Sequence, residues 1–264
     1  MNDDWKIERS EVLVDIRPAQ KIAVLTLNRP QLRNAFNASL MVALSDTVAR
    51  LDADPDIRAI VLTGAGKVFC AGMDLGEFAN GEGEKAVFDS GLPEFTRQRR
   101  KTPIIAAVRG AALAGGFEIM LACDLVVAAQ DAIFGLPEVR VGLIAGAGGV
   151  AHLPNRIPVA LAREILLLGA PVDAKRAFEA GLINQIADAD DVLPNAIVMA
   201  QQIAANAPLA VAATMGIIHQ AMSGGAGALN TLNDELLRDI MRSDDAKEGA
   251  TAFKERRVPK WTGV

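Results

Sequence analysis

The sequence predicts an α/β core followed by a helical C-terminal region, and three observations lead to this prediction. Short apolar runs of strand type alternate with helical segments over the first half of the chain, as in α/β proteins. After about residue 150 the strand pattern fades and the remaining segments have helical spacing. The 264 residues are 51% hydrophobic but only 4% aromatic, so aliphatic side chains are expected to build the core. We divide the chain into an α/β core, residues 1–200, and a helical region, residues 201–264.

The expected strands are short apolar or alternating runs bounded by turn or helix signals. In the first of them Val12, Val14 and Ile16 alternate with polar residues, and the turn signal Arg17-Pro18 separates it from the second. The expected strands are 12–16, 22–27, 57–62, 104–108 and 125–128.

The expected helices are recognised by capping residues and by apolar residues that recur every three or four positions. Asn37 is placed to cap the first helix, and Asp54-Pro55 is placed to end it. Asp173 should cap a short helix that Gly181 follows. The other expected helices are 115–123, 160–168, 191–206, 209–222, 228–241 and 243–256.

The charge and the apolar pattern exclude several classes of protein. The chain has 27 basic and 32 acidic residues, a net charge of −5, whereas wrapping nucleic acid requires a positive face. Basic residues concentrate only in 246–264, which suits a small anionic ligand better than a polymer. The acidic N-terminus does not resemble a signal peptide, and no uncharged run is long enough to span a membrane. We expect a cytoplasmic protein in which Cys70 and Cys123 are reduced core residues.

Several chemistries lack the residues that they need. The glycine-rich segment 146–151 matches a dinucleotide fingerprint only as a string, because no good strand precedes it. The segment 64–67, GAGK, lacks the Ser or Thr of a phosphate-binding loop. His152 and His219 are far apart in the sequence and have no clustered ligands, so no metal site is expected. Cys70 has no evident histidine base, and no serine nucleophile motif is present.

The most informative segment is 111–128, in which Glu118 and Asp124 are the only charged residues. Burying a glutamate in an apolar helix raises its pKa, which is what a general acid or base needs near neutral pH. Gly115 and Gly116 lie one turn earlier, where the free N–H groups of a helix start favour a developing oxyanion. The alternative is a structural glutamate that is hydrogen-bonded to a neighbouring loop, and the sequence leaves both open.

Two further segments carry candidate site residues. Glu138 follows a proline and precedes the glycine-rich turn, so we expect it at a strand end where the chain changes direction. In 69–75, FCAGMDL, Gly72 lies between small residues and allows a close approach of the backbone to a ligand. Met73 could then donate its backbone N–H.

Together these motifs resemble the crotonase (enoyl-CoA hydratase/isomerase) superfamily, and the resemblance covers nearly the whole chain. It implies a crotonase-like spiral of ββα units, with C-terminal helices that assemble homotrimers or dimers of trimers. The motifs in chain order are LNRP (27–30) with Asn34-Ala35, FCAGMDL (69–75), RGAALAGGFE (109–118), FGLPE (134–138), GAGG (146–149) and KEGATAFKERR (247–257).

The resemblance also implies a site. The backbone N–H groups of Met73 and Gly115 match an oxyanion hole for a thioester. Family hydratases use two glutamates, which fall on Glu118 and Glu138, whereas the isomerases typically keep only the second. No metal or redox cofactor is implied, because CoA enters as part of the substrate. The motifs further imply contacts with the substrate or its CoA at Arg29, Ala35, Ala71, Asp74, Leu75, Phe253 and Arg256.

These expectations describe an enoyl-CoA hydratase that acts on acyl-CoA thioesters. A Δ3,Δ2-enoyl-CoA isomerase and a carnitinyl-CoA dehydratase-like enzyme are the alternatives within the family. An RNA-binding or scaffold member is the non-enzyme alternative, and the acidic net charge argues against it. Ala114, Ala145 and His152 depart from common family residues near the acyl pocket, so the acyl group stays open.

Overall fold

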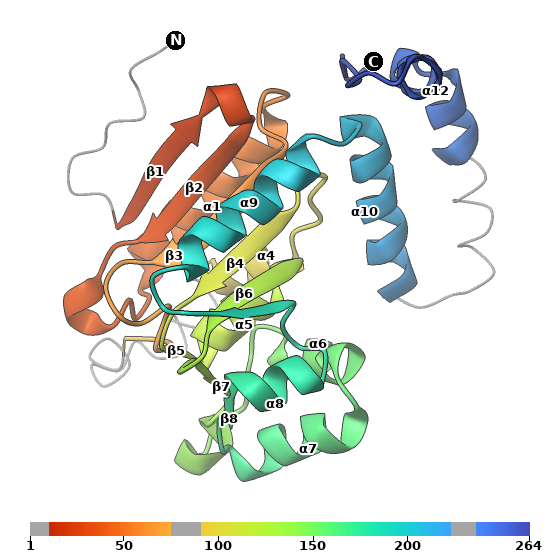
Figure 1. Cartoon of the computed structure of the whole chain (residues 1–264). Coiled ribbons are helices and arrows are strands. Elements are labelled where there is room, and N and C mark those ends of the chain that lie inside the picture. The colour runs from red at the N-terminus through yellow and green to blue at the C-terminus, as the bar shows by residue number, and fades with distance from the viewer. Residues whose placement is uncertain (1–10, 75–90, 223–235) are drawn as a thin grey trace.

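The structure is a computed structural model that describes residues 11–74, 91–222 and 236–264. It contains two β-sheets with helices packed around them (Figure 1). The larger sheet has the strand order β1-β2-β3-β4-β6-β9, and the smaller sheet has the order β5-β7-β8. The strands of the larger sheet are β1 (Val12–Arg17), β2 (Ile22–Leu27), β3 (Ala59–Gly64), β4 (Ile104–Val108), β6 (Leu125–Ala129) and β9 (Gln185–Ala187). Those of the smaller sheet are β5 (Ala111–Leu113), β7 (Ile133–Gly135) and β8 (Val172–Asp173).

Helices cover both faces of the larger sheet. Helix α9 lies across one face and contacts β3, β4 and β6, while α1 lies behind the same sheet (Figure 1). The helices are α1 (Ala38–Ala53), α4 (Leu92–Arg97), α5 (Gly115–Leu121), α6 (Gly149–Arg156), α7 (Val159–Leu168), α8 (Ala174–Glu179), α9 (Val192–Ala204), α10 (Pro208–Met222) and α12 (Asp244–Glu255). Short 3₁₀ turns are η1 (Pro18–Gln20), η2 (Pro30–Leu32) and η4 (Glu138–Val141).

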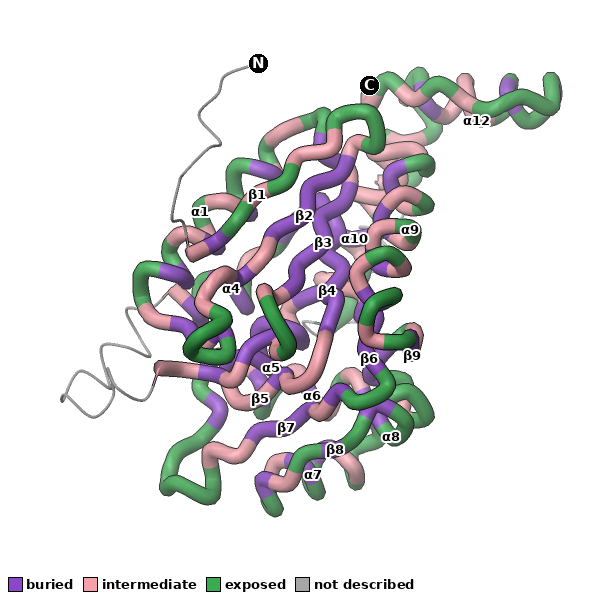
Figure 2. Tube along the Cα trace, turned by 60° about the vertical axis from the view of Figure 1, so that its left-hand side comes forward, coloured by how far each residue is buried: buried purple, intermediate pink, exposed green. Residues whose placement is uncertain are grey.

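The larger sheet is parallel except for β1, which pairs antiparallel with β2. All residues of β4 are buried, and the inner strands are the most continuously buried part of the chain trace (Figure 2). Parallel strands covered on both faces have continuous apolar sequences, and this is the pattern by which β4 and β6 are predicted.

The five expected strands are confirmed, although β3 begins two residues later than expected, at Ala59. Strands β5, β7, β8 and β9 were not expected, and the prediction that strands fade after residue 150 is wrong for β8 and β9. Each of these four strands has only two or three residues. Pairing with a distant strand defines them, and a run this short has no periodicity of its own.

The capped helices are confirmed by their geometry. The Asn37 side chain accepts the N–H of Leu40 at the start of α1, and Asp173 caps α8 in the same way. Helices α4 and α6 were not expected; each is short and contains a proline, Pro93 in the first turn of α4 and Pro154 inside α6. The expected helix 228–241 lies largely outside the described residues.

Five phenylalanines join the aliphatic core, so the expectation of a wholly aliphatic core is incomplete. One is Phe36, and the other four are fully buried, three of them within motif segments and Phe95 in α4. The rings of Phe117 and Phe134 are 6.0 Å apart between their centroids. Phe117 directly precedes Glu118 in α5, so this aromatic pair anchors the helix that carries the first glutamate. The four fully buried phenylalanines are Phe69, Phe95, Phe117 and Phe134.

Helix α12 lies beyond the end of α9 and away from α5, while α10 runs from the end of α9 back toward the end of α5 (Figure 1). Arg58 joins this region to the sheet by donating to the carbonyl oxygens of Ala204, at 3.2 Å, and Trp261, at 3.3 Å. The Trp261 indole in turn donates to the Ala205 carbonyl oxygen. Residue 200 lies inside α9, and the division into 1–200 and 201–264 stays a prediction.

No helix among the described residues is by itself long and apolar enough to cross a membrane. Helices α9 and α10 would satisfy the length and composition only together, and they are bent by 106° where they meet.

Candidate active site

The start of α5 is packed so tightly that glycine is required there. A Cβ atom at Gly115 would collide with the Phe36 ring, and one at Gly116 would collide with the Cys70 carbonyl oxygen. The preceding residue, Ala114, has a positive φ of 50° and donates its N–H to the Gly135 carbonyl oxygen at 2.9 Å. Backbone contacts therefore fix where α5 begins.

The FCAGMDL segment lies directly against this helix start. A Cβ atom at Gly72, whose φ is 103°, would lie 3.7 Å from the Gly115 nitrogen. Phe36 pairs with the segment by donating to the Gly72 carbonyl oxygen and accepting the Asp74 N–H. Neither the Met73 N–H nor the Gly115 N–H donates to an acceptor within the described residues. The structure thus places two available donors at neighbouring positions, as an oxyanion hole requires.

Glu118 lies one turn into α5 and is only 4% exposed. Its Oε1 accepts the N–H groups of Ala147 and Gly149, each at 2.8 Å. Burial raises its pKa to about 7, because desolvation and the nearby Glu138 charge outweigh the stabilising backbone hydrogen bonds. Glu118 is thus hydrogen-bonded to a neighbouring loop, as the structural interpretation expects, and its pKa is raised to about 7, while its catalytic role stays a prediction. Since both hydrogen bonds use Oε1, Oε2 stays available to a ligand.

Glu138 is the first residue of η4, three positions after β7 ends, as the sequence predicts. Its Oε2 is buried and has no hydrogen-bond partner in the described part of the chain. Burial raises its pKa above the usual value. The charge on Glu138 contributes to raising the pKa of Glu118, which places the two carboxyl groups near each other.

The turn that contains Ala147 and Gly149 is a functional element whose role the sequence did not reveal. The sequence shows the GAGG motif of this turn, but the groups that bind Glu118 are backbone amides, which do not depend on the type of side chain. Gly149 is the first residue of α6, so its N–H is free of intrahelical bonds and can bind a carboxylate. The glycines were the available signal, because Gly148 has a φ of 112°.

Arg29 connects the N-terminal motif to the site loops. Its guanidinium donates to the Ala35 carbonyl oxygen at 2.7 Å and pairs with Asp74 at 3.0 Å and Glu11 at 3.1 Å. Asn34 is fully buried and accepts the Arg29 N–H through its side chain. Three predicted contact residues, Arg29, Ala35 and Asp74, therefore lie together, and a contact with CoA stays a prediction.

The remaining predicted contact residues divide into three groups. Ala71 joins the same loops by donating its N–H to the Arg33 carbonyl oxygen. Leu75 lies outside the described residues. Phe253, which is 88% exposed, and Arg256, at the end of α12, lie apart from α5 within one chain (Figure 2).

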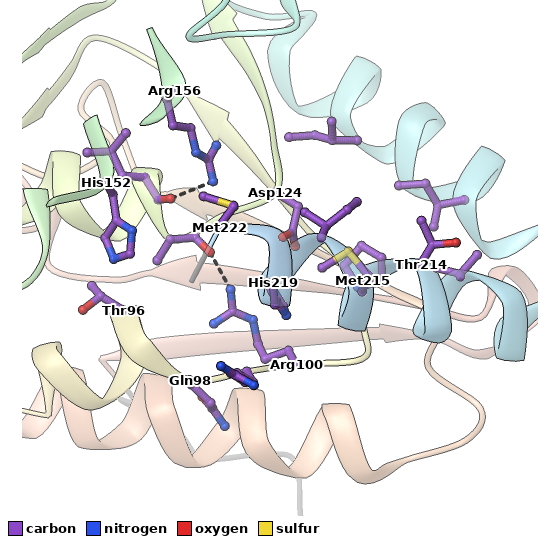
Figure 3. Close-up of a pocket in the computed structure, with 18 of the residues that line it drawn as sticks. Thr96, Gln98, Arg100, Asp124, His152, Arg156, Thr214, Met215, His219 and Met222 are labelled. Carbon is purple, nitrogen blue, oxygen red and sulfur yellow. Dashed lines mark hydrogen bonds between the residues drawn. The ribbon is translucent and has the colours of Figure 1, made fainter. Parts of the chain in front are cut away.

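A cavity of about 780 Å³ lies on the far side of the GAGG turn, between α10 and the ends of α5 and α6 (Figure 3). Arg100 and Arg156 form part of its wall and bind the C-terminal carbonyl oxygens of α5. Arg100 donates to Ala122, and Arg156 donates to Leu121 at 2.9 Å and Cys123 at 2.7 Å. Cations at a helix C-terminus stabilise it, so these contacts hold the end of the helix that carries Glu118.

Both histidines line this cavity, His152 from α6 and His219 from α10. Burial lowers the pKa of each. Among the described residues, no group of three or more His, Cys, Asp or Glu side chains is arranged to hold a metal ion.

Comparison with known proteins agrees with this geometry. The sequence matches the family model described as Enoyl-CoA hydratase/isomerase over residues 17–264. A carnitinyl-CoA dehydratase of Proteus mirabilis (strain HI4320) is 36% identical over 248 residues, covering 90% of this chain and 94% of the relative. A 2,3-dehydroadipyl-CoA hydratase of Escherichia coli (strain K12) is 34% identical over 255 residues, covering 96% and 99%. A crystal structure of enoyl-CoA hydratase from Mycobacterium tuberculosis H37Rv is 46% identical, with a TM-score of 0.89, and covers 97% of this chain and 100% of that chain. The chain therefore belongs to the enoyl-CoA hydratase/isomerase family.

Proposed function

We propose that this hydratase-type enzyme adds water across the double bond of trans-2-enoyl-CoA thioesters to give 3-hydroxyacyl-CoA. The observation that carries the proposal is two neighbouring carboxyl groups with raised pKa values, the buried Glu118 and the partly buried Glu138. Hydration needs one group to take a proton from water and another to deliver a proton to the substrate. Two carboxyl groups with raised pKa values can divide these tasks near neutral pH.

The thioester carbonyl oxygen would accept the N–H groups of Met73 and Gly115. These donors stabilise the negative charge that develops on the oxygen as water adds to Cβ. Loss of one such donor typically costs about 3–4 kcal/mol of transition-state stabilisation. The charge on the carbonyl oxygen also makes Cα basic, so that Cα can take up a proton.

Water would lie between Oε2 of Glu118 and the carboxyl group of Glu138. One carboxylate takes the water proton while the oxygen bonds to Cβ, and the other carboxyl group gives its proton to Cα. The sum of the two transfers is one water added, and the two carboxyl groups again carry one proton between them.

A dehydratase acting on a hydroxylated acyl-CoA is the second candidate, and the 36% identity to a carnitinyl-CoA dehydratase supports it. This reaction is the reverse of hydration and uses the same two groups. An isomerase needs only one base, so Glu118 would then have no chemical task. An RNA-binding role has no support from the basic tail, because Arg257 is paired with Glu248 and Glu255.

A panel of purified acyl-CoA thioesters tests the proposal by mass spectrometry. Crotonyl-CoA and longer or carboxylated 2-enoyl-CoA substrates should gain the mass of one water molecule. Conversion of a 3-enoyl-CoA to its 2-isomer without a mass change, and without hydration of any 2-enoyl-CoA, would contradict hydration.

We further propose a homotrimer or dimer of trimers that works in the cytoplasm, within fatty acid metabolism, without a cofactor other than the CoA of its substrate. Exposed apolar side chains of the C-terminal region support assembly, since a surface of this kind marks an interface. Light scattering should give a multiple of the 27.8 kDa chain mass, and a monomer at micromolar concentration would contradict assembly. Dialysis against a chelator should leave the rate unchanged. The exposed residues are Ile218, Met222, Leu237, Met241 and Phe253.

A further inference from the structure

Two backbone amides of one turn hold the Glu118 carboxylate. The Ala147 and Gly149 N–H groups both donate to Glu118 Oε1. The residue between them, Gly148, is the N-cap of α6 and has no side chain that could cap the helix. A contact from outside the turn can therefore help to set the direction of both amides.

Thr96 makes such a contact from α4. Its hydroxyl donates to the Ala147 carbonyl oxygen at 2.5 Å, across 51 positions of the sequence, and the residue is only 8% exposed. The alternative acceptor, the Pro93 carbonyl oxygen of its own helix, is 3.3 Å away. A hydroxyl has one proton to donate, and the shorter distance assigns it to Ala147. Figure 3 places Thr96 beside His152, whose ring packs against Gly148.

The Ala147 carbonyl stands between the two donor amides along the chain. Fixing this carbonyl fixes the peptide plane that links Ala147 to Gly148, and so the path of the chain to the Gly149 N–H. We infer that Thr96 is a positioning residue of the active site, which aligns the Ala147 and Gly149 amides on Glu118 and thereby sets the proton affinity of this carboxyl group. Groups that orient the partners of a reacting residue commonly affect its chemistry in this way.

The sign of the effect follows from the charges. Backbone N–H groups stabilise the ionised carboxylate and lower the pKa of Glu118, while desolvation raises it. Without the Thr96 hydroxyl, the two amides are less well aligned and the pKa of Glu118 should rise. Whichever role Glu118 has in proton transfer, the limb of the pH–rate profile that it controls should move to higher pH.

The test compares Thr96→Val, which keeps shape but removes the donor, with Thr96→Ser, which restores it. Thr63→Val is the matched control, because Thr63 is also buried and donates across the sheet to a carbonyl oxygen, that of Ala107 at 2.9 Å. With crotonyl-CoA, Thr96→Val should lower kcat about three- to tenfold, the value of one hydrogen bond, with KM changed less than about twofold. Its Glu118-controlled limb should move up by about half a pH unit.

The controls separate positioning from stability. Thr96→Ser should return kcat to within about twofold of the wild type. Thr63→Val should lower the melting temperature but leave kcat and the pH limb unchanged. A Thr96→Val enzyme with a wild-type limb, and with no greater loss of kcat than Thr63→Val, would overturn the inference. If Thr96→Val does not fold, Thr96→Cys takes its place, since a thiol is only a weak donor.

The kinetic measurements rest on the proposed hydration activity. A second measurement is therefore chosen that does not depend on activity. Infrared titration follows the protonated-carboxyl band that Glu118→Gln removes. In Thr96→Val this band should persist to higher pH than in the wild type and in Thr63→Val. An unmoved band would refute the positioning role even if no thioester is hydrated, and a moved band would support it.

Discussion

The start of α5 and the C-terminal helices differ in how completely the chain covers its own side chains. All seven residues of α5 are buried, including its glutamate. In α10 only Met215 is buried, although that helix has the higher proportion of apolar residues. The first region tolerates a buried acid because backbone groups satisfy it, while the second leaves exposed apolar surface of the kind that marks an interface. Burial therefore distinguishes the proposed reacting group of α5 from the proposed surface for assembly.

The largest expected effect is at the two carboxyl groups of the proposed site. Glu118→Gln and Glu138→Gln should each lower kcat for hydration by about 10²–10⁴, the usual range for loss of a general acid or base. KM should change little, because the CoA moiety is bound elsewhere. Steady-state kinetics on crotonyl-CoA measure both, and Glu179→Gln on the exposed face of α8 is the control.

These variants also separate the two chemistries of the family. If the enzyme moves double bonds, only Glu138→Gln should be severe. A Glu118→Gln variant that hydrates at nearly the wild-type rate would break the proposed mechanism.

The second effect is on stability as a function of pH. Folding raises the pKa of Glu118 from 4.5 to about 7, so the folded protein binds this proton more tightly than the unfolded chain. The stability linked to this group is fully present below about pH 4.5 and is lost as the pH rises to about 7. Glu118→Gln should therefore gain roughly 3 kcal/mol in free energy of unfolding relative to wild type over this range.

Urea unfolding at a series of pH values measures this difference. If the difference in free energy of unfolding between Glu118→Gln and the wild type stays constant with pH, folding does not raise the pKa of Glu118.

The third effect compares glycines in helices of the two regions. Gly116→Ala in α5 should lower the free energy of unfolding by about 1–3 kcal/mol, because its Cβ meets the Cys70 carbonyl oxygen. Gly216→Ala in α10 has nothing within 4 Å of its Cβ and should raise it by about 0.5–1 kcal/mol. Denaturant unfolding of both variants tests the comparison. A loss at Gly216 would mean that another chain packs on this face of α10.

The smallest effect is expected at the exposed end of α12. Arg256→Ala should raise KM for an acyl-CoA about two- to fivefold, as expected for a solvent-exposed ionic contact with the phosphates. Short pantetheine thioesters, which lack these phosphates, should be unaffected. Arg163→Ala, at an exposed position of α7, is the control. An equal loss on both substrates would point to assembly rather than to CoA binding.

The sequence predicted those features that are encoded locally. The cap at Asn37 and the apolar run of β4 depend on neighbouring residues, and both are present in the structure. Glu118 could be recognised because a charge in a long apolar segment requires an explanation. The two N–H donors, Met73 and Gly115, followed from the family resemblance rather than from periodicity.

The contacts that hold the site could not be predicted in this way. The amides on Glu118 come from 29 and 31 positions further along the chain, and Thr96 reaches Ala147 across 51 positions. Backbone amides do not depend on the type of side chain, so the sequence pattern does not show which amides bind Glu118. Thr96 lies in a short helix with a proline in its first turn, and the hydrogen bond of its hydroxyl to Ala147 can be recognised only once the fold is known.

Ala114 shows how local strain and active-site geometry are balanced. Its positive φ is unfavourable for any residue with a side chain, and a glycine there would relieve this strain. Yet its methyl group occupies the space beside Gly72, where an added Cβ would lie only 2.8 Å away. The methyl group therefore acts as a spacer between the two segments that present the N–H donors. Replacing Ala114 by glycine would relieve the strain but would remove this spacer. Thermal stability and a fixed separation of the two N–H donors therefore favour different residues at this position.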